Sequence, residues 1–176
     1  HADVKWTLAS RKDRSGLLIV AKDDAAHNRL TDMFQERQIV KIYKAIVYGK
    51  VRDPEGTLSF SIGRSSSDRK KMAVRRDGRS AITHYKLTEH MGMFSAVNLS
   101  LETGRTHQIR VHMAFIGCPV VGDRVYGFRK QRVRLKRQFL HAAELAFDQP
   151  STGERLSFES PLPVGLTNIL EKLRRR

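Results

Sequence analysis

Nine residues, Gly104 to His112, constrain the fold of this chain most, because they are densely polar and lead into a regular apolar pattern. They read Gly-Arg-Thr-His-Gln-Ile-Arg-Val-His, a composition that packing alone does not explain. The side-chain oxygen of Thr106 could cap a helix by accepting hydrogen bonds from its first backbone N–H groups. Gly117 and Pro119 would end that helix. Its apolar positions recur at helical spacing, at Ile109, Met113 and Ile116.

This predicted helix places Arg110 in its first turn, next to the positive end of the helix dipole. A cation beside a helix N-terminus can hold a carboxylate in its ionised form or bind a phosphate. We therefore expect an anion site at Arg110. The alternative is a surface helix whose arginine is solvated.

The chain has 176 residues, of which 40% are hydrophobic, so a single domain with a real core is expected. Its formal net charge of +15 favours a polyanionic partner, most often a nucleic acid, because it supplies many groups that neutralise phosphates. A membrane partner is not expected, since the sequence contains no long apolar run.

The single cysteine, Cys118, has no partner for an internal disulfide, which favours a reducing compartment. The sequence shows no signal-peptide pattern. We expect a cytoplasmic protein, and a monomer.

A mixture of strand-like and helix-like segments predicts an α+β fold. Residues 16–22 form a continuous apolar run typical of a buried strand, and Asp23 and Asp24 open a helix with Ala26, Leu30, Met33 and Phe34 on one face. A turn is expected at 52–56, and a polar, basic loop or hairpin at 62–78. Further strands are expected at 39–48, 81–88, 94–101, 138–147 and 155–159, and a last helix at 166–173.

The histidines of the polar stretch do not form a metal site in this prediction. His107 and His112 are five residues apart, which points them in different directions on a helix and to opposite faces of a strand. With one cysteine and no nearby carboxylate cluster, we expect no zinc and no other metal. We expect His141 to be structural.

Several motifs, in order along the chain, resemble the RluA/RluD-type pseudouridine synthases of the large ribosomal subunit. They span roughly residues 11 to 170, and the Asp68 to Val74 segment with Thr83-His84-Tyr85 is similar to the RluD-like branch. The motifs are residues 15–22, 41–49, 104–112, 119–127, 139–143, 150–154 and 160–163. The resemblance implies a mixed, mainly antiparallel sheet with flanking helices, and an enzyme that isomerises uridine to pseudouridine in RNA, with large-subunit ribosomal RNA as partner. It implies no cofactor.

The family's N-terminal Lys-Pro-x-Gly element is absent from this sequence. We therefore expect residues 1–176 to be a single catalytic domain that lacks its N-terminal part.

The resemblance assigns the catalytic carboxylate to the segment before Ser15. The family motif is His-Arg-Leu-Asp-(Lys/Arg)-Asp-Thr-Ser-Gly, whose first aspartate is essential. Aligned without a gap, that aspartate falls on Arg11, and the enzyme would be inactive. With two residues missing before Ser15, Arg11-Lys12-Asp13-Arg14 matches Arg-Leu-Asp-Arg, which makes Asp13 the candidate nucleophile. The alternative for Asp13 is an exposed aspartate in a charged turn.

The other catalytic candidates follow from the same resemblance. Tyr43 matches the tyrosine that stacks on the target base near C5, Arg110 matches the partner of the catalytic carboxylate, and Arg11 matches the arginine that enters the RNA stack when the uridine flips out. The carboxylate could attack C1′ of the sugar or C6 of the base, or promote formation of a glycal, and the sequence does not choose. From position alone, Tyr43 would be a core residue and Arg11 another phosphate-facing cation.

Basic residues supply the expected RNA contacts, at Arg11, Arg69, Lys70, Lys71, Arg105, His107, Arg129 and Lys130. A catalytically silent RNA-binding module on the same scaffold is the main alternative function. A basic structural protein of the ribosome is a third, and it would not require Tyr43, Arg110 and a carboxylate to meet in one pocket.

Overall fold

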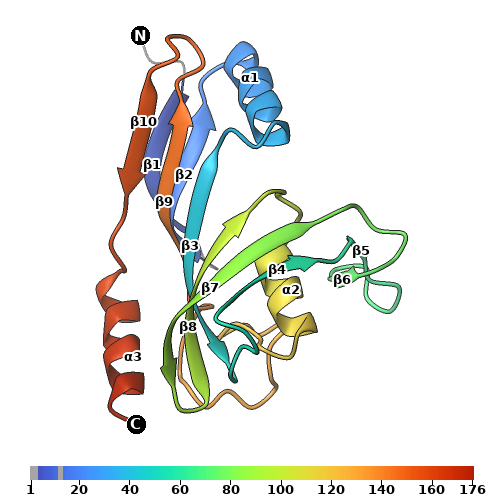
Figure 1. Cartoon of the computed structure of the whole chain (residues 1–176), viewed down its shortest axis with the longest axis vertical. Helices are drawn as coiled ribbons and strands as arrows, with labels where there is room; N and C mark the ends of the chain where they lie inside the picture. The colour runs from blue at the N-terminus through green and yellow to red at the C-terminus, as the bar shows by residue number, and fades with distance from the viewer. Residues whose placement is uncertain (1–3, 12–13) are drawn as a thin grey trace.

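The computed structural model describes residues 4–11 and 14–176, with side chains from residue 15 onward. The fold is α+β, as expected: a mainly antiparallel sheet with three flanking helices in the described residues (Figure 1). The strands are β1 (Val4–Arg11), β2 (Arg14–Ala21), β3 (Val40–Tyr48), β4 (Glu55–Ser59), β5 (Ile62–Arg64), β6 (Met72–Val74), β7 (Ile82–Met91), β8 (Phe94–Leu101), β9 (Leu140–Asp148) and β10 (Arg155–Glu159). The helices are α1 (Asp24–Gln35), α2 (Gln108–Phe115) and α3 (Val164–Arg174).

The main sheet has the strand order β1-β2-β9-β3-β8-β7-β4, and β10 also pairs with β9. Only β2 and β9 run parallel among these described pairs, and Gly16 pairs there with Ala142. Gly16 has φ +112°, and a Cβ on it would overlap the carbonyl oxygen of Ala142. A glycine is required at this point because it allows β2 to approach β9 so closely.

The helices and loops cover the sheet over three apolar clusters, and a small fourth cluster joins the β5–β6 hairpin to α2. One lies under α2 and includes Tyr43, one lies under α3, and one lies under α1. The β5–β6 hairpin is a separate two-stranded sheet that projects from one side of the molecule (Figure 1). Among the described residues, no helix is long and apolar enough to cross a membrane.

Three local predictions differ from the structure. Val20 is 44% exposed, although it belongs to the apolar run that was expected to be buried. Phe34, expected on the apolar face of α1, is 39% exposed, and the Lys41 ammonium lies 5.1 Å from the centroid of its ring. The expected turn at 52–56 is shorter, since β4 begins at Glu55. Apolar character alone does not locate the covered face, because the neighbouring elements decide which side of a strand or helix meets water.

Candidate active site

A pocket of about 460 Å³ opens where β3 and β9 meet the start of α2. It brings together Tyr43, from β3, and Arg110, from the first turn of α2. Arg105 and His107, both predicted to contact RNA, also line it. Four predicted site residues, separated by up to 67 positions in the sequence, therefore share one pocket. The other lining residues are Leu101, Thr106, Gln108, Ile109, Gln138 and Leu140.

Arg110 is buried and paired. Its Nε and Nη2 donate hydrogen bonds of 2.8 and 3.0 Å to the two carboxylate oxygens of Asp123, and the side chains are 8% and 1% exposed. The alternative of a solvated surface arginine is therefore wrong. Arg110 holds the carboxylate of Asp123, while its predicted pairing with the catalytic carboxylate stays a prediction.

Asp123 is ionised in this environment. Burial would raise the pKa of its carboxyl group, but the hydrogen bonds and charge of Arg110, together with backbone N–H bonds from Tyr126 and Val125, lower the pKa below its usual value. The backbone bonds measure 3.0 and 2.9 Å to Oδ1. Gly122, with φ +81°, gives the chain the turn that precedes Asp123, and a Cβ on it would overlap the Arg137 carbonyl.

Tyr126 joins the buried ion pair to the β5–β6 hairpin. Its ring faces the Arg110 guanidinium, and the Cζ atom of Arg110 lies 4.9 Å from the centroid of the tyrosine ring. Its hydroxyl accepts a 3.0 Å hydrogen bond from the backbone N–H of Met72, on β6. The same hydroxyl lies 2.8 Å from Nδ1 of His107, at the entrance of α2. One side chain thus contacts the ion pair, the hairpin and the pocket wall.

The helix α2 starts differently from the prediction. His107, not Thr106, is the N-terminal cap; it adopts the left-handed conformation with φ +57° and makes no capping side-chain bond. The side chain of Gln108 turns back instead, and its Oε1 accepts from the Thr103 hydroxyl at 2.7 Å and from the Arg105 N–H at 3.0 Å. The predicted apolar face is confirmed, since Ile109 and Met113 are buried and Ile116 packs against the same cluster.

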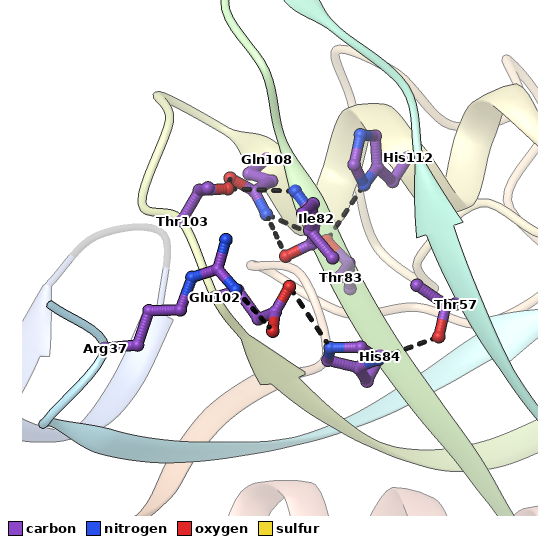
Figure 2. Close-up of polar contacts among 9 residues, drawn as sticks. All are labelled: Arg37, Thr57, Ile82, Thr83, His84, Glu102, Thr103, Gln108 and His112. Carbon is purple, nitrogen blue, oxygen red and sulfur yellow. Dashed lines mark hydrogen bonds and ion pairs between the residues drawn. The ribbon is translucent and has the colours of Figure 1, made fainter. Parts of the chain in front are cut away.

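Gln108 also begins a buried chain of hydrogen bonds, drawn in Figure 2. Its Nε2 donates at 3.0 Å to the Ile82 carbonyl and to the Thr83 hydroxyl, and Thr83 lies 2.9 Å from Nδ1 of His112. Because Nε2 of His112 donates to the Phe60 carbonyl at 2.8 Å, Nδ1 accepts from Thr83. The chain fixes the start of α2 against β7, and with it the position of Arg110.

His112 and His141 share one arrangement. Burial lowers the pKa of both below the usual histidine value, although the hydrogen bond each makes to a backbone carbonyl opposes this. In His141, Nδ1 lies 2.8 Å from the Ser15 hydroxyl and Nε2 donates to the Ser160 carbonyl at 2.8 Å. Both are buried and fully bonded, which agrees with a structural role for His141.

Within the described part of the chain, no three His, Cys, Asp or Glu side chains lie close enough together to hold a metal ion.

The remaining predicted residues lie elsewhere. Asp13 falls outside the described residues, so its predicted role stays a prediction, and Arg11 is described only as the last residue of β1. Arg69, Lys70 and Lys71 lie in the connection between β5 and β6, away from the pocket lining. Arg129 and Lys130 are exposed in the loop that follows Tyr126.

Asp123, Tyr126 and Gln108 are the site residues that sequence reasoning missed. Asp123 and Tyr126 belong to residues 122–127, which are part of one motif of the resemblance, but the resemblance assigned no role to either residue. The available signal was that stretch itself, with an aspartate and a tyrosine between two glycines.

The fold and the pocket define a member of the RNA pseudouridylate synthase family: residues 12–115 match this family, and the chain belongs to it. A solved structure titled human RNA pseudouridylate synthase domain containing 1 superposes with a TM-score of 0.73 at 30% identity, covering 98% of this chain and 81% of that one. A second, titled human RNA pseudouridylate synthase domain containing 4, gives 0.75 at 26% identity, covering 96% and 76%.

Two bacterial relatives agree with the predicted resemblance. A Bacillus subtilis protein named uncharacterized RNA pseudouridine synthase YlyB is 46% identical over 164 residues, which are 93% of this chain and 54% of the relative. Ribosomal large subunit pseudouridine synthase D of Pseudomonas aeruginosa is 44% identical over 175 residues, with the same two shares. The chain spans about half the length of these relatives.

Proposed function

We propose that this protein isomerises uridine to pseudouridine in RNA, and that its substrate is large-subunit ribosomal RNA. The observation that carries the proposal is a pocket lined by both Tyr43 and Arg110, in which the Arg110 guanidinium is held by the buried Asp123. Family membership and the similarity to large-subunit pseudouridine synthases support the same chemistry. A basic structural protein of the ribosome would not need these side chains to converge.

Asp13 is the proposed catalytic carboxylate. Ser15 pairs with His141 in β9, and the adjacent Ala142 pairs with Tyr43. Ser15 is the second residue after Asp13 in the sequence, and two residues of chain span at most about 7 Å. Asp123 takes two of the five N–H donors of Arg110, which leaves three for a second carboxylate. These features support Arg110 as a shared partner of Asp123 and Asp13.

The reaction breaks the bond between C1′ and N1 of the uridine, joins C1′ to C5, removes the C5 proton and places a proton on N1. It is an isomerisation without a redox step, so the proposal requires no cofactor and no metal. Asp13 would supply the carboxylate, by attack or by promoting a glycal. Tyr43 would stack on the flipped base near C5, while Arg11 would fill its place in the RNA.

The proposal assigns RNA contacts to basic residues on three segments. Arg105 and His107 line the pocket. The β5–β6 connection supplies the exposed Arg69 and Lys70 and the half-buried Lys71, and the loop after Tyr126 supplies the exposed Arg129 and Lys130. In this proposal residues 1–176 act as one catalytic domain, as a monomer, in the cytoplasm. The buried free thiol of Cys118 fits a reducing compartment.

The test is release of tritium from an unmodified large-subunit ribosomal RNA transcript labelled at C5 of uridine. We expect release by the wild-type chain and none by Asp13→Asn, which removes only the charge. Asp148→Asn, at an exposed ion pair on β9, is the matched control and should release tritium like the wild type.

The other outcomes separate the alternatives. Release that survives in Asp13→Asn overturns the assignment of the carboxylate. No release by the wild type, together with tight and salt-sensitive RNA binding, would identify a catalytically silent RNA-binding module.

A further inference from the structure

A second pocket, of about 420 Å³, lies where β3 and α2 end. It shares no lining residue with the candidate active site. Tyr43 lines the candidate active site and Tyr48 lines the second pocket. Both tyrosines lie on β3, five residues apart, which corresponds to about 16 Å along the strand. The lining residues are Tyr48, Gly49, Met93, Gly117, Phe128, Lys130 and Arg132.

The wall of this pocket is aromatic and partly open to water. Tyr48 is 4% exposed and contacts the rings of Phe94 and Phe128, with both ring centroids 5.2 Å away. Phe128 is 52% exposed and Met93 is 45% exposed. Exposed apolar side chains that gather at one pocket, rather than scattering, indicate a binding surface.

Gln131 holds the pocket in shape. Its Oε1 accepts from the Tyr48 hydroxyl at 2.9 Å and from the Gly122 N–H at 3.1 Å, while its Nε2 donates to the carbonyls of Phe128 and Asp123 at 2.7 and 3.3 Å. The aromatic wall is therefore fixed to the backbone of Asp123, the partner of Arg110. Both pockets are supported by one loop.

The rim of this pocket is positively charged. Lys130 and Arg132 line it, and residues 129–137 contain six basic residues and no acidic one. The chain as a whole carries +15. Phosphates would be attracted to this rim, and an aromatic face beside them suits a base, because every base can stack on a ring.

We propose that this second pocket binds an unpaired base of the RNA substrate, stacked on Phe128, with flanking phosphates against Lys130 and Arg132. The inference rests on the proposed RNA-binding function and adds a base-stacking site outside the uridine pocket. The charge favours RNA over a protein occupant, since a protein contact at an apolar surface would not require six adjacent cations.

The test compares a fluorescent single-stranded adenylate oligonucleotide with an abasic strand that has the same number of phosphates. The wild-type chain should bind the adenylate strand more tightly, and Phe128→Ala should reduce that preference about tenfold, which corresponds to the loss of one stacked base. Phe128→Leu keeps the apolar volume without the ring and should give the same reduction. Phe115→Ala, an equally exposed phenylalanine outside both pockets, should leave the preference unchanged.

An unchanged preference in both folded Phe128 variants overturns the proposal. The experiment distinguishes a failure of the base-stacking proposal from a failure of the proposed enzymatic activity. A base preference that depends on Phe128 supports the stacking site even if the chain releases no tritium from labelled RNA, in which case only the proposed enzymatic activity fails.

Discussion

The Arg110–Asp123 pair is the residue contact on which the candidate site most depends, because both charges are buried. In Asp123→Asn, Arg110 would keep its charge and lose its ionised partner. Leaving a buried charge unpaired costs about 3–5 kcal/mol, so we expect the free energy of unfolding to fall by that amount. Urea denaturation at neutral pH measures the change.

Asp148→Asn is the comparison for this prediction. Asp148 pairs with Arg155 at 3.2 Å, but both side chains are 53% exposed, and an exposed pair contributes little. Equal destabilisation by the two variants would contradict the idea that Asp123 neutralises a buried charge.

Two buried histidines predict how stability depends on pH. The pKa of His112 and of His141 is lowered in the folded protein, mainly by burial. As the pH falls below about 6.5, the unfolded chain binds protons that the folded protein does not, so the free energy of unfolding decreases until the pH reaches the folded pKa values. The lowered pKa of Asp123 acts in a separate window, below about 3.9.

Urea midpoints measured at pH 7.5, 6.5 and 5.5 should therefore fall in that order. His112→Gln removes one of the two groups and should flatten the decline, whatever its effect at pH 7.5. His27→Gln is the control, since this side chain on α1 is exposed. A decline that is unchanged in His112→Gln would exclude His112 as its cause.

Among the elements, the β5–β6 hairpin contacts the site through the Tyr126 hydroxyl and through an apolar cluster that includes Ile62 and Val111. Tyr126→Phe keeps the ring over Arg110 and removes the group that accepts from the Met72 N–H and contacts His107. We expect faster hydrogen exchange at the Met72 amide, and RNA binding weakened about fivefold, the equivalent of about 1 kcal/mol. Amide exchange by mass spectrometry and fluorescence titration measure the two effects.

Tyr85→Phe provides the matched control, because it removes a tyrosine hydroxyl from β7 at a residue that packs in the cluster under α2 and not in that of the hairpin. Unaltered exchange at Met72 in Tyr126→Phe would show that strand pairing and apolar packing hold the hairpin without this hydroxyl.

Elements with strong local signals could be predicted from the sequence. Asp23 caps α1 by accepting from the Ala26 N–H at 2.8 Å, and Ala26, Leu30 and Met33 are buried as their spacing predicts. The strands around the Gly92 turn were also placed correctly, since their pattern and turn residue agree.

The start of α2 was missed because the contacts of Gln108 with Thr103 and β7 replace a local cap, and propensity does not encode tertiary contacts.

The site was predictable only in part, for a related reason. Tyr43 and Arg110 carried family signals and meet in one pocket, and the helical spacing correctly placed Arg110 in a first turn. Arg110 and Asp123 are 13 positions apart in the sequence and meet because the chain turns at Gly122. Neither helical nor strand periodicity of the sequence predicts such a contact. Charge and pattern identify candidates, whereas the fold decides which of them touch.

At the scale of the whole molecule, the net charge of +15 predicts RNA binding that weakens steeply with salt. For a single strand, each cation that contacts a phosphate contributes about 0.7 to the slope of log affinity against log salt concentration. Replacing Arg69, Lys70 and Lys71 of the hairpin with glutamine removes three such cations. The slope should therefore become shallower by about 2.

A matched triple variant tests whether position matters as well as charge. Glutamine at Lys172, Arg175 and Arg176, all exposed at the end of α3, removes the same charge from a helix distant from the hairpin (Figure 1). We expect that variant to keep the wild-type slope, because counterions are released only where a cation meets a phosphate. Fluorescence anisotropy titrations over a range of salt concentrations give both slopes. Equal slopes for the two triple variants would mean that the charge acts as a diffuse field, and the hairpin would then not be an RNA contact.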